Sequence, residues 1–174
     1  MPEKKLFDLS QNLLPLNIEI KKGKLKNINK YLDIFDECKH DNYISHGEVI
    51  CGRATSELKW AGNIIQQMKQ EFIYCIINNK YEVFEILLSD VLIGFTIIET
   101  NKKSKSAVLS DIMIKKDYQG KGIGKKVLQK IEEYLKNKNI GIVLLESGIK
   151  NENVHHFFEK NGYKRISIVY SKNL

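Results

Sequence analysis

Three closely spaced glycines form the clearest chemical pattern in this 174-residue sequence. Gly120, Gly122 and Gly124 lie in "DYQGKGIGKKVLQK" (117–130), and an amphipathic run follows them at once. Glycine lets the backbone turn so that several N–H groups point to one place. The first turn of a helix leaves further N–H groups unpaired, beside a partial positive charge. A loop of this kind before a helix suits an anion, most simply a phosphate.

Lysines surround the glycine stretch. The formal net charge is +7, and residues 101–140 hold eleven lysines against four acids, so this segment accounts for the whole excess. A local positive field supports a phosphate site. For most of these lysines the ordinary alternative is that they solvate a helix surface.

Two common phosphate loops do not fit the stretch. A Walker loop, GxxxxGK[ST], would need a glycine in place of Gln119 and a hydroxyl residue in place of Lys126. A dinucleotide loop, GxGxxG, that starts at Gly120 would need a glycine in place of Lys125.

The pattern that does fit is Gln-x-x-Gly-x-Gly, at Gln119, Gly122 and Gly124. It resembles the loop of the GNAT superfamily of acyl-CoA-dependent N-acyltransferases, [Arg/Gln]-x-x-Gly-x-[Gly/Ala], which binds the pyrophosphate of CoA. A second block, "LLESGIKNENVHHFFEKNGYK", resembles a later block of that family. Its matching positions are Glu146, Asn151, Phe158, Lys160, Gly162 and Tyr163. The resemblance covers roughly Tyr81 to Lys164.

The resemblance implies acetyl-CoA as co-substrate, an amine as acceptor and no metal. It places the pantetheine arm along the backbone of Ile112, Met113 and Ile114. It places the pyrophosphate over the loop Gln119, Gly120, Lys121, Gly122, Ile123, Gly124 and Lys125. Asn151 would bond the pantetheine arm, with a helix N-cap as its alternative role. Phe158 occupies the family's tyrosine position and would face the CoA sulfur.

Acyl transfer to an amine requires a neutral amine and a polarised carbonyl. A backbone N–H of the Ile112–Ile114 strand could polarise the thioester carbonyl. Glu146 matches a position that serves as base in some family members, and burial there would raise its pKa toward a useful range. A structural carboxylate that accepts backbone N–H groups is its alternative reading. Asp111 and Glu99, on neighbouring strands, are alternative bases.

The sequence lacks a general acid at the family's tyrosine position, because Phe158 has no proton to donate. Tyr170 on the last strand and Tyr118 beside the loop are candidates, or the thiolate leaves unassisted. The gap leaves open a catalytically silent acyl-CoA-binding regulatory module. His155 and His156 are adjacent on a helix and are expected to be surface or packing residues.

The acceptor is the least determined part. Asp33, Asp36, Glu37 and Asp41 gather on one side of the first helix, a segment that borders the acceptor site in the family. With Asp111 and Glu146 opposite, they would favour a small cationic amine, such as a polyamine or an aminoglycoside-like compound. A solvated helix face is the alternative reading of these acids, and a peptide or protein amine is the alternative acceptor.

Hydrophobic periodicity predicts the elements that hold these residues, in the order β-α-α-β-β-β-α-β-α-β. Strands are expected at 17–22, 81–88, 91–99, 107–114, 140–147 and 163–172. Helices are expected at 25–38, 55–78, 122–137 and 151–161, and 45–55 is expected to be a loop. This is an α/β (α+β) class, and the resemblance adds a mixed, mostly antiparallel sheet splayed between its fourth and fifth strands. We expect one domain over 1–174, with 1–16 a less ordered or additional N-terminal segment.

Composition excludes several classes of protein. The longest apolar runs, "VLIGFTII" and "FIYCII", are far too short to span a membrane, and the N-terminus lacks a signal-peptide pattern. We therefore expect a cytoplasmic protein without a membrane partner. Cys38, Cys51 and Cys75 form no CxxC pair, which argues for buried thiols and against a disulfide framework or a zinc site. No aromatic-basic platform supports nucleic-acid binding, and a homodimer is possible.

Overall fold

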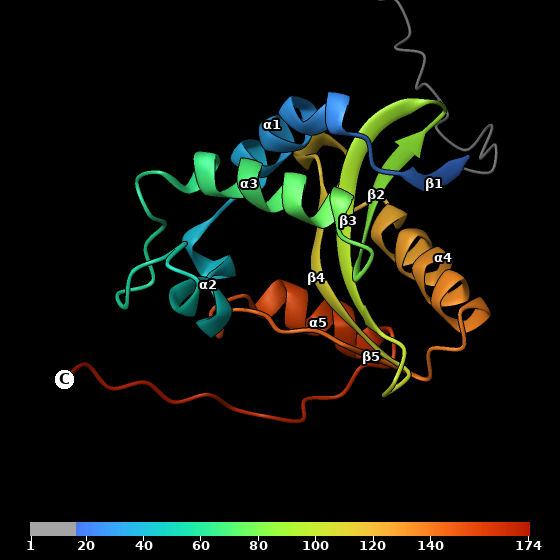
Figure 1. Ribbon diagram of the computed structural model, residues 1–174. Coiled ribbons are helices and arrows are strands. Elements are labelled where there is room, and N and C mark those ends of the chain that lie inside the picture. Colours follow the sequence, from blue (N-terminus) through green and yellow to red (C-terminus); the bar gives the residue numbers. More distant parts are fainter. Residues whose placement is uncertain (1–16) are drawn as a thin grey trace, which may run out of the picture.

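The computed structural model describes residues 17–174, so the expectation for residues 1–16 lies outside the described residues. A five-stranded sheet in the order β1-β2-β3-β4-β5 forms its centre (Figure 1). The strands are β1 (Ile18–Lys22), β2 (Tyr81–Leu88), β3 (Val91–Asn101), β4 (Ser106–Ile114) and β5 (Ile142–Leu144). The first four are antiparallel, and β5 joins β4 in parallel. The predicted fold class is confirmed.

The part of the chain that the structure describes has five α-helices around the sheet. They are α1 (Ile28–Cys38), α2 (His46–Ile50), α3 (Ile64–Ile77), α4 (Ile123–Asn137) and α5 (Glu152–Lys160), with short 3-10 turns at Leu25–Asn27, Asp41–Tyr43 and Lys116–Tyr118. Between residues 17 and 174, no helix combines the length and the apolar character that crossing a membrane requires.

The two faces of the sheet carry separate cores. On one face, α1 and α3 pack Phe35 and Phe72 against Phe95 and Ile97. On the other face, α4 packs its apolar stripe against the sheet, together with Phe158 of α5. That stripe consists of the five residues expected from the sequence: Ile123, Val127, Leu128, Ile131 and Leu135. Burying it orients α4, and so fixes where the glycine stretch at its N-terminus lies.

The sheet opens between β4 and β5. Only Ser106, Ala107 and Val108 of β4 pair with β5, and the remainder of β4 has no partner on that side among the described strands. The expected strand 140–147 is therefore paired over three residues only. The predicted splay between the fourth and fifth strands is confirmed.

A β-bulge in β4 decides which way its second half faces. Ile97 pairs with Asp111 and Ile98 pairs with Leu109, so Ser110 is the extra residue. Before the bulge, Leu109 faces the α4 core. Strict alternation would send Asp111 to that same face, but the bulge reverses the pattern. Asp111 and Met113 consequently lie on the α1–α3 side of the sheet.

Three expected elements were wrong. Residues 45–55, expected to be a loop, contain the short helix α2. The helix expected from Thr55 begins only at Ile64, because residues 53–61 form a loop closed by the Ala54–Trp60 bridge, with Leu58 at a φ of 58°. The last strand, expected at 163–172, is not formed, and residues 164–174 are exposed throughout. Of the three thiols expected to be buried, Cys51 is exposed.

Candidate active site

The glycine stretch forms an open turn at the start of α4. Gly120 and Gly122 have φ angles of 71° and 74°, a region that favours glycine. A Cβ atom built at either position would meet nothing within 4 Å. After Gln119, the first N–H of the described turn to find a backbone carbonyl is that of Lys126, which donates to Gly122 O at 3.3 Å. The N–H groups of residues 120–125 therefore have no backbone acceptor among the described residues, and an anion site requires such free donors.

Gln119 ties this turn to the sheet. Its Nε2 donates to the carbonyl of Ile114, the last residue of β4, at 2.7 Å. Gly124 has a different role from the other two glycines, because a Cβ there would approach the ring of Phe157 at 3.4 Å. That distance is an ordinary van der Waals contact, so packing does not require glycine at position 124, whereas the positive φ angles of Gly120 and Gly122 shape the open turn.

A cavity of about 180 Å³ lies where β4 and β5 separate. Asp111 of β4, Glu146 just after β5, and Tyr43, Glu48, Arg53 and Trp60 from the segment between α1 and α3 all contribute to its wall. The Trp60 Nε1 donor is buried and has no partner within residues 17–174. The cavity therefore brings three carboxylates, one guanidinium and an unused N–H donor next to the opened sheet.

Asp111 is the most strongly perturbed carboxyl group of the cavity. Burial first, and then the charge of Glu48, raise its pKa to about 7 from an ordinary value of 3.8, although Arg53 acts in the opposite direction. Its backbone carbonyl accepts a hydrogen bond from Thr96 Oγ1 at 2.7 Å, which holds the bulged strand in place. A carboxyl with a pKa near neutrality is suited to accept a proton from an amine.

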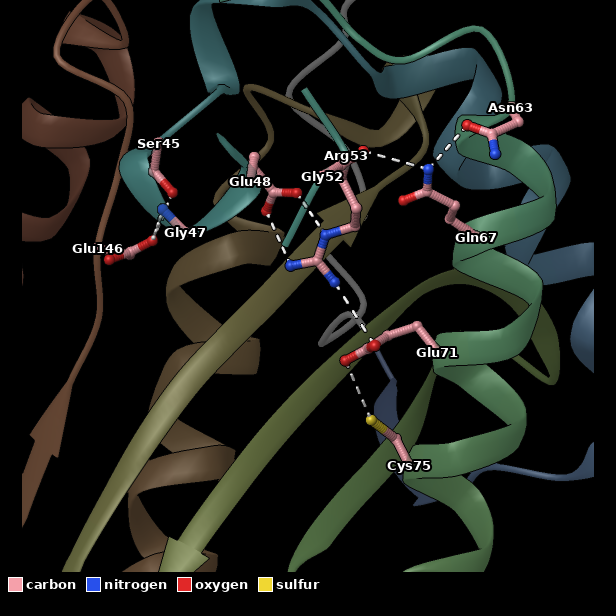
Figure 2. Close-up of polar contacts among 10 residues, drawn as sticks. All are labelled: Ser45, Gly47, Glu48, Gly52, Arg53, Asn63, Gln67, Glu71, Cys75 and Glu146. Atoms are coloured by element: carbon pink, nitrogen blue, oxygen red, sulfur yellow. Dashed lines mark hydrogen bonds and ion pairs between the residues drawn. The ribbon is translucent and has the colours of Figure 1, made fainter. Parts of the chain in front are cut away.

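Glu146 is held differently. Its Oε1 accepts hydrogen bonds from Ser45 Oγ and from the Gly47 N–H, the latter at 3.1 Å, and its Oε2 lies 3.0 Å from His46 Nδ1. Its side chain is 45% exposed, so the desolvation that we expected at this position acts on the half-buried Asp111 instead. Bonding of the carboxylate to α2 matches the structural alternative (Figure 2).

Gly148 permits the segment after β5 to lie close to the residues that follow α1. A Cβ at Gly148 would collide with the backbone carbonyls of Asn42 and Ile44. The absence of a side chain therefore lets the segment after β5 lie against the residues that follow α1.

Arg53 is the cation of the cavity. Its Nε donates to Glu48 Oε2 at 2.6 Å, and its Nη1 lies 3.6 Å from Glu71 Oε2 (Figure 2). Glu71 in turn accepts from the Cys75 thiol at 3.6 Å, and burial raises the pKa of that thiol to about 12. Sequence reasoning missed Glu48 and Arg53 because they lie in a segment without periodicity. The charged residues within "GEVICGR" were the only available signal.

The remaining candidate residues are dispersed. Asn151 is buried at the N-terminus of α5, and its side chain makes no cap bond. Phe158 is 7% exposed and packs against Phe157 and Tyr163, so it is an interior residue as expected. Tyr170 is 89% exposed and lies outside the cavity wall. Glu99 pairs with Lys80 at 2.5 Å and is also not part of that wall.

The acids of α1, and Asp41 in the turn after it, do not line the cavity. Asp36 pairs with Lys39, Asp41 pairs with Lys59 at 2.5 Å, and Asp33 is exposed. Glu37 Oε1 accepts the backbone N–H of Lys116 at 2.8 Å and so fixes the turn after β4. Asp111 and Glu146 line the cavity as expected, and Glu48 stands in place of the acids expected from this helix.

Comparisons with known proteins agree with this geometry. Residues 53–163 match the model of the acetyltransferase (GNAT) family. A curated relative, an uncharacterised N-acetyltransferase of Methanocaldococcus jannaschii, is 25% identical over 116 residues, which is 64% of this chain. The chain matches only 45% of that relative's length.

Solved structures share the fold. A putative acetyltransferase, YycN, from Bacillus subtilis is 18% identical with a TM-score of 0.66, over 90% of this chain and 98% of that one. The PaiA N-acetyltransferase of Thermoplasma acidophilum, solved with coenzyme A, is 22% identical with a TM-score of 0.63, over 86% and 91%. An aminoglycoside acetyltransferase from an uncultured soil metagenomic sample, solved with sisomicin, is 13% identical with a TM-score of 0.58, over 90% and 96%. The family match spans more than half of the sequence and includes the glycine turn, Asp111 and Glu146, and on that ground the chain belongs to the acetyltransferase (GNAT) family.

Proposed function

We propose that the protein transfers an acetyl group from acetyl-CoA to the amine of a small cationic acceptor, by direct attack without a covalent enzyme intermediate. The observation that carries this proposal is the position of Asp111. Its carboxyl group, with a pKa raised to about 7, lines a cavity at the opening of the sheet, and the glycine turn follows the end of the same strand.

The glycine turn fits the pyrophosphate of CoA. Its N–H groups from Gly120 to Lys125 have no backbone acceptor among the described residues, there is open space at Gly120 and Gly122, and Lys121 and Lys125 are exposed. The unpaired edge of β4, from Ile112 to Ile114, would hold the pantetheine arm through backbone groups. Asn151 would bond the same arm, since its side chain is not used as a helix cap. Phe158 would lie against the sulfur end.

Proton transfer is assigned to Asp111. Ionised Asp111 accepts the proton of the incoming ammonium, so that the neutral amine can attack the thioester carbonyl. A backbone N–H of β4 stabilises the developing oxyanion. Glu146, bound to α2, contributes negative charge and orients the opposite wall. Tyr43 supplies a phenol at the cavity, and it replaces Tyr170 as the candidate proton donor for the leaving thiolate.

The charges of the cavity favour a cationic acceptor. Glu48, Asp111 and Glu146 face a single cation, Arg53, which is already paired with Glu48. A second amino group of a polyamine or an aminoglycoside would meet this negative field, and an acidic substrate would be repelled. The aminoglycoside acetyltransferase that was solved with sisomicin has the same fold, which supports this class of acceptor.

A turnover screen tests the proposal. Release of CoA thiol is measured with acetyl-CoA and a panel of polyamines, aminoglycosides, amino acids and peptide N-termini. We expect the polycations to be the best acceptors, with rates that fall as salt is added because partly exposed ion pairs are screened. Turnover confined to peptides would refute the acceptor class. Tight CoA binding without turnover of any amine would instead favour the silent regulatory module.

A further inference from the structure

Trp60 carries a hydrogen-bond donor that the described part of the chain leaves unused. The residue contributes to the wall of the cavity at the opening of the sheet, and its Nε1 atom is buried without a partner among residues 17–174. It is also the single tryptophan of the sequence. Because buried polar groups are paired with few exceptions, an unpaired indole N–H beside a cavity favours a partner that arrives with a ligand.

Packing alone does not account for a tryptophan at this position. The indole packs edge-on against Phe35 of α1, with ring centroids 5.7 Å apart and an interplanar angle of 77°. It lies, partly buried, at the border of the α1–α3 core. A phenylalanine would supply the same kind of contact and would bury no N–H group. What tryptophan adds here is a donor, and a few placed polar groups in an otherwise apolar wall are typical of a binding site.

Two of the three carboxylates of the wall are bonded within the chain. Glu48 accepts hydrogen bonds from Arg53 Nε at 2.6 Å and from Arg53 Nη2 at 3.3 Å. Glu146 accepts the Gly47 N–H at 3.1 Å. The third carboxylate, Asp111, is the one assigned to the amine. A ligand in the cavity therefore meets a carboxylate that takes an ammonium proton and a separate N–H donor that needs an acceptor atom.

The chemistry of the indole N–H separates two kinds of cationic amine. An indole nitrogen donates a hydrogen bond and cannot accept one. Ammonium groups also donate only, so a protonated polyamine offers Trp60 no partner. A hydroxyl oxygen does accept. An amine that carries a hydroxyl group can satisfy both Asp111 and Trp60, whereas a plain polyamine leaves the indole N–H buried and unpaired.

The loop that holds Trp60 allows its side chain to follow a ligand. The Nε1 atom is closed to solvent, so the indole has to shift as the cavity is filled. Residues 55–57 of the loop are exposed. The loop is closed by the Ala54–Trp60 bridge and by the Thr55 N–H, which donates to the Lys59 carbonyl at 2.8 Å. Segments with few buried contacts open locally without unfolding the elements around them.

We propose that Trp60 determines the specificity of the acceptor site, because its indole N–H donates a hydrogen bond to a hydroxyl oxygen of the acceptor. This assignment rests on the proposed acetyl transfer. It narrows the acceptor from cationic amines in general to amino alcohols and amino sugars. Asp111 takes the proton of the amine, and Trp60 selects the molecule that also carries the oxygen.

Two diamines that differ by one hydroxyl group test the assignment. They are trimethylenediamine and the same diamine with a hydroxyl group on its central carbon. Calorimetry measures the Kd of each for the CoA-bound protein, at a pH at which both are dications. Because the sequence has a single tryptophan, the one indole N–H signal in a proton–nitrogen NMR spectrum reports the hydrogen bond of Trp60 without any turnover.

Two variants accompany the wild type. Trp60→Phe keeps an aromatic ring and removes the N–H group. Met68→Leu is the matched control, because Met68 belongs to the same wall and the exchange conserves its volume. Circular dichroism establishes that each variant is folded, and the NMR measurement on the wild type does not depend on either variant.

The hydroxylated diamine should bind the wild type and Met68→Leu at least about tenfold more tightly than the plain diamine, and the ratio should fall to about one in Trp60→Phe. The indole proton signal should move downfield with the hydroxylated diamine only. Equal affinities in the wild type overturn the assignment. So does a preference that survives Trp60→Phe, or an indole signal that neither diamine moves.

Acetylation of the two diamines is measured separately, so that the two proposals can fail independently. Equal kcat/KM for both diamines would leave acetyl transfer in place and overturn the role of Trp60. A hydroxyl preference in binding that Trp60→Phe abolishes, without acetylation of any amine, would uphold Trp60 as a ligand contact and contradict the proposed reaction.

Discussion

Replacing Asp111 with Asn should stabilise the protein above neutral pH and remove its activity. The carboxyl pKa is raised from 3.8 to about 7, first by burial and then by Glu48. One pKa unit corresponds to about 1.4 kcal/mol, so ionised Asp111 lowers the free energy of unfolding by about 4 kcal/mol at most. The neutral amide of Asn has almost the same shape and no such charge. The predicted gain is therefore of the order of 2–4 kcal/mol at high pH.

The pH dependence fixes the sign of this effect. Below pH 3.8 the carboxyl is protonated in both the folded and the unfolded chain, and its favourable contribution is fully present. As the pH rises from about 4 to about 7, only the unfolded chain releases the proton, so the free energy of unfolding of the wild type falls relative to Asp111→Asn. Above about pH 7 both states are ionised, and the difference stays constant. The stability gain of the variant must develop between about pH 4 and about pH 7.

Activity should change in the opposite direction. The wild-type rate should rise with pH through about 7, as Asp111 becomes ionised. Loss of a general base lowers kcat by roughly 10²–10⁴-fold, and the rise near pH 7 should disappear in Asp111→Asn. Urea unfolding at about pH 5 and about pH 8.5, together with pH–rate profiles, measures both effects.

Glu146→Gln is the matched control, because Glu146 lines the same cavity but is 45% exposed. It should not reproduce the pH-dependent gain in stability. The reasoning about Asp111 is refuted if Asp111→Asn keeps the wild-type pH–rate profile. It is equally refuted if the difference in unfolding free energy is the same at both pH values.

Three other predictions concern the CoA site and the cavity. Gly122→Val places a branched side chain in the open turn at a φ of 74°. Calorimetry should therefore show a Kd for CoA raised at least about tenfold. The control Gly124→Ala, whose side chain is directed at Phe157, should leave the Kd unchanged. Phe158→Tyr should leave CoA affinity intact and raise kcat, because at the proposed site of the CoA sulfur it would add a proton donor. A lower or equal kcat would show that thiolate protonation is not limiting. Arg53→Met leaves Glu48 without its cation, and urea unfolding should show a loss of about 1–3 kcal/mol; unchanged stability would mean that water replaces the guanidinium.

Much of the fold follows from the local chemistry of the sequence. The glycine turn and α4 were predicted together, because the amphipathic stripe of α4 and the conformational freedom of Gly120 and Gly122 are properties of adjacent residues. The antiparallel strands β2, β3 and β4 were also predicted, since alternation and short turns specify them locally. Glu146 and Asp111 were identified from their types and positions as candidates for the general base. The surroundings of each carboxylate could not be predicted in this way.

Tertiary structure alone decided which of those carboxylates is buried and which segments complete the cavity. The bulge at Ser110 turns Asp111 to the α1–α3 face, and a bulge depends on how two strands pair, so one strand's alternation does not reveal it. Glu48 of α2 and Arg53, three residues after α2, reach the cavity from a segment whose sequence has no periodicity. The pattern of residues 164–174 indicates a strand, and yet a strand exists only where a partner supplies hydrogen bonds. Local sequence therefore determined the helix, strand and turn propensities of each segment. Pairing between distant segments decided which strands form and which side chains line the cavity.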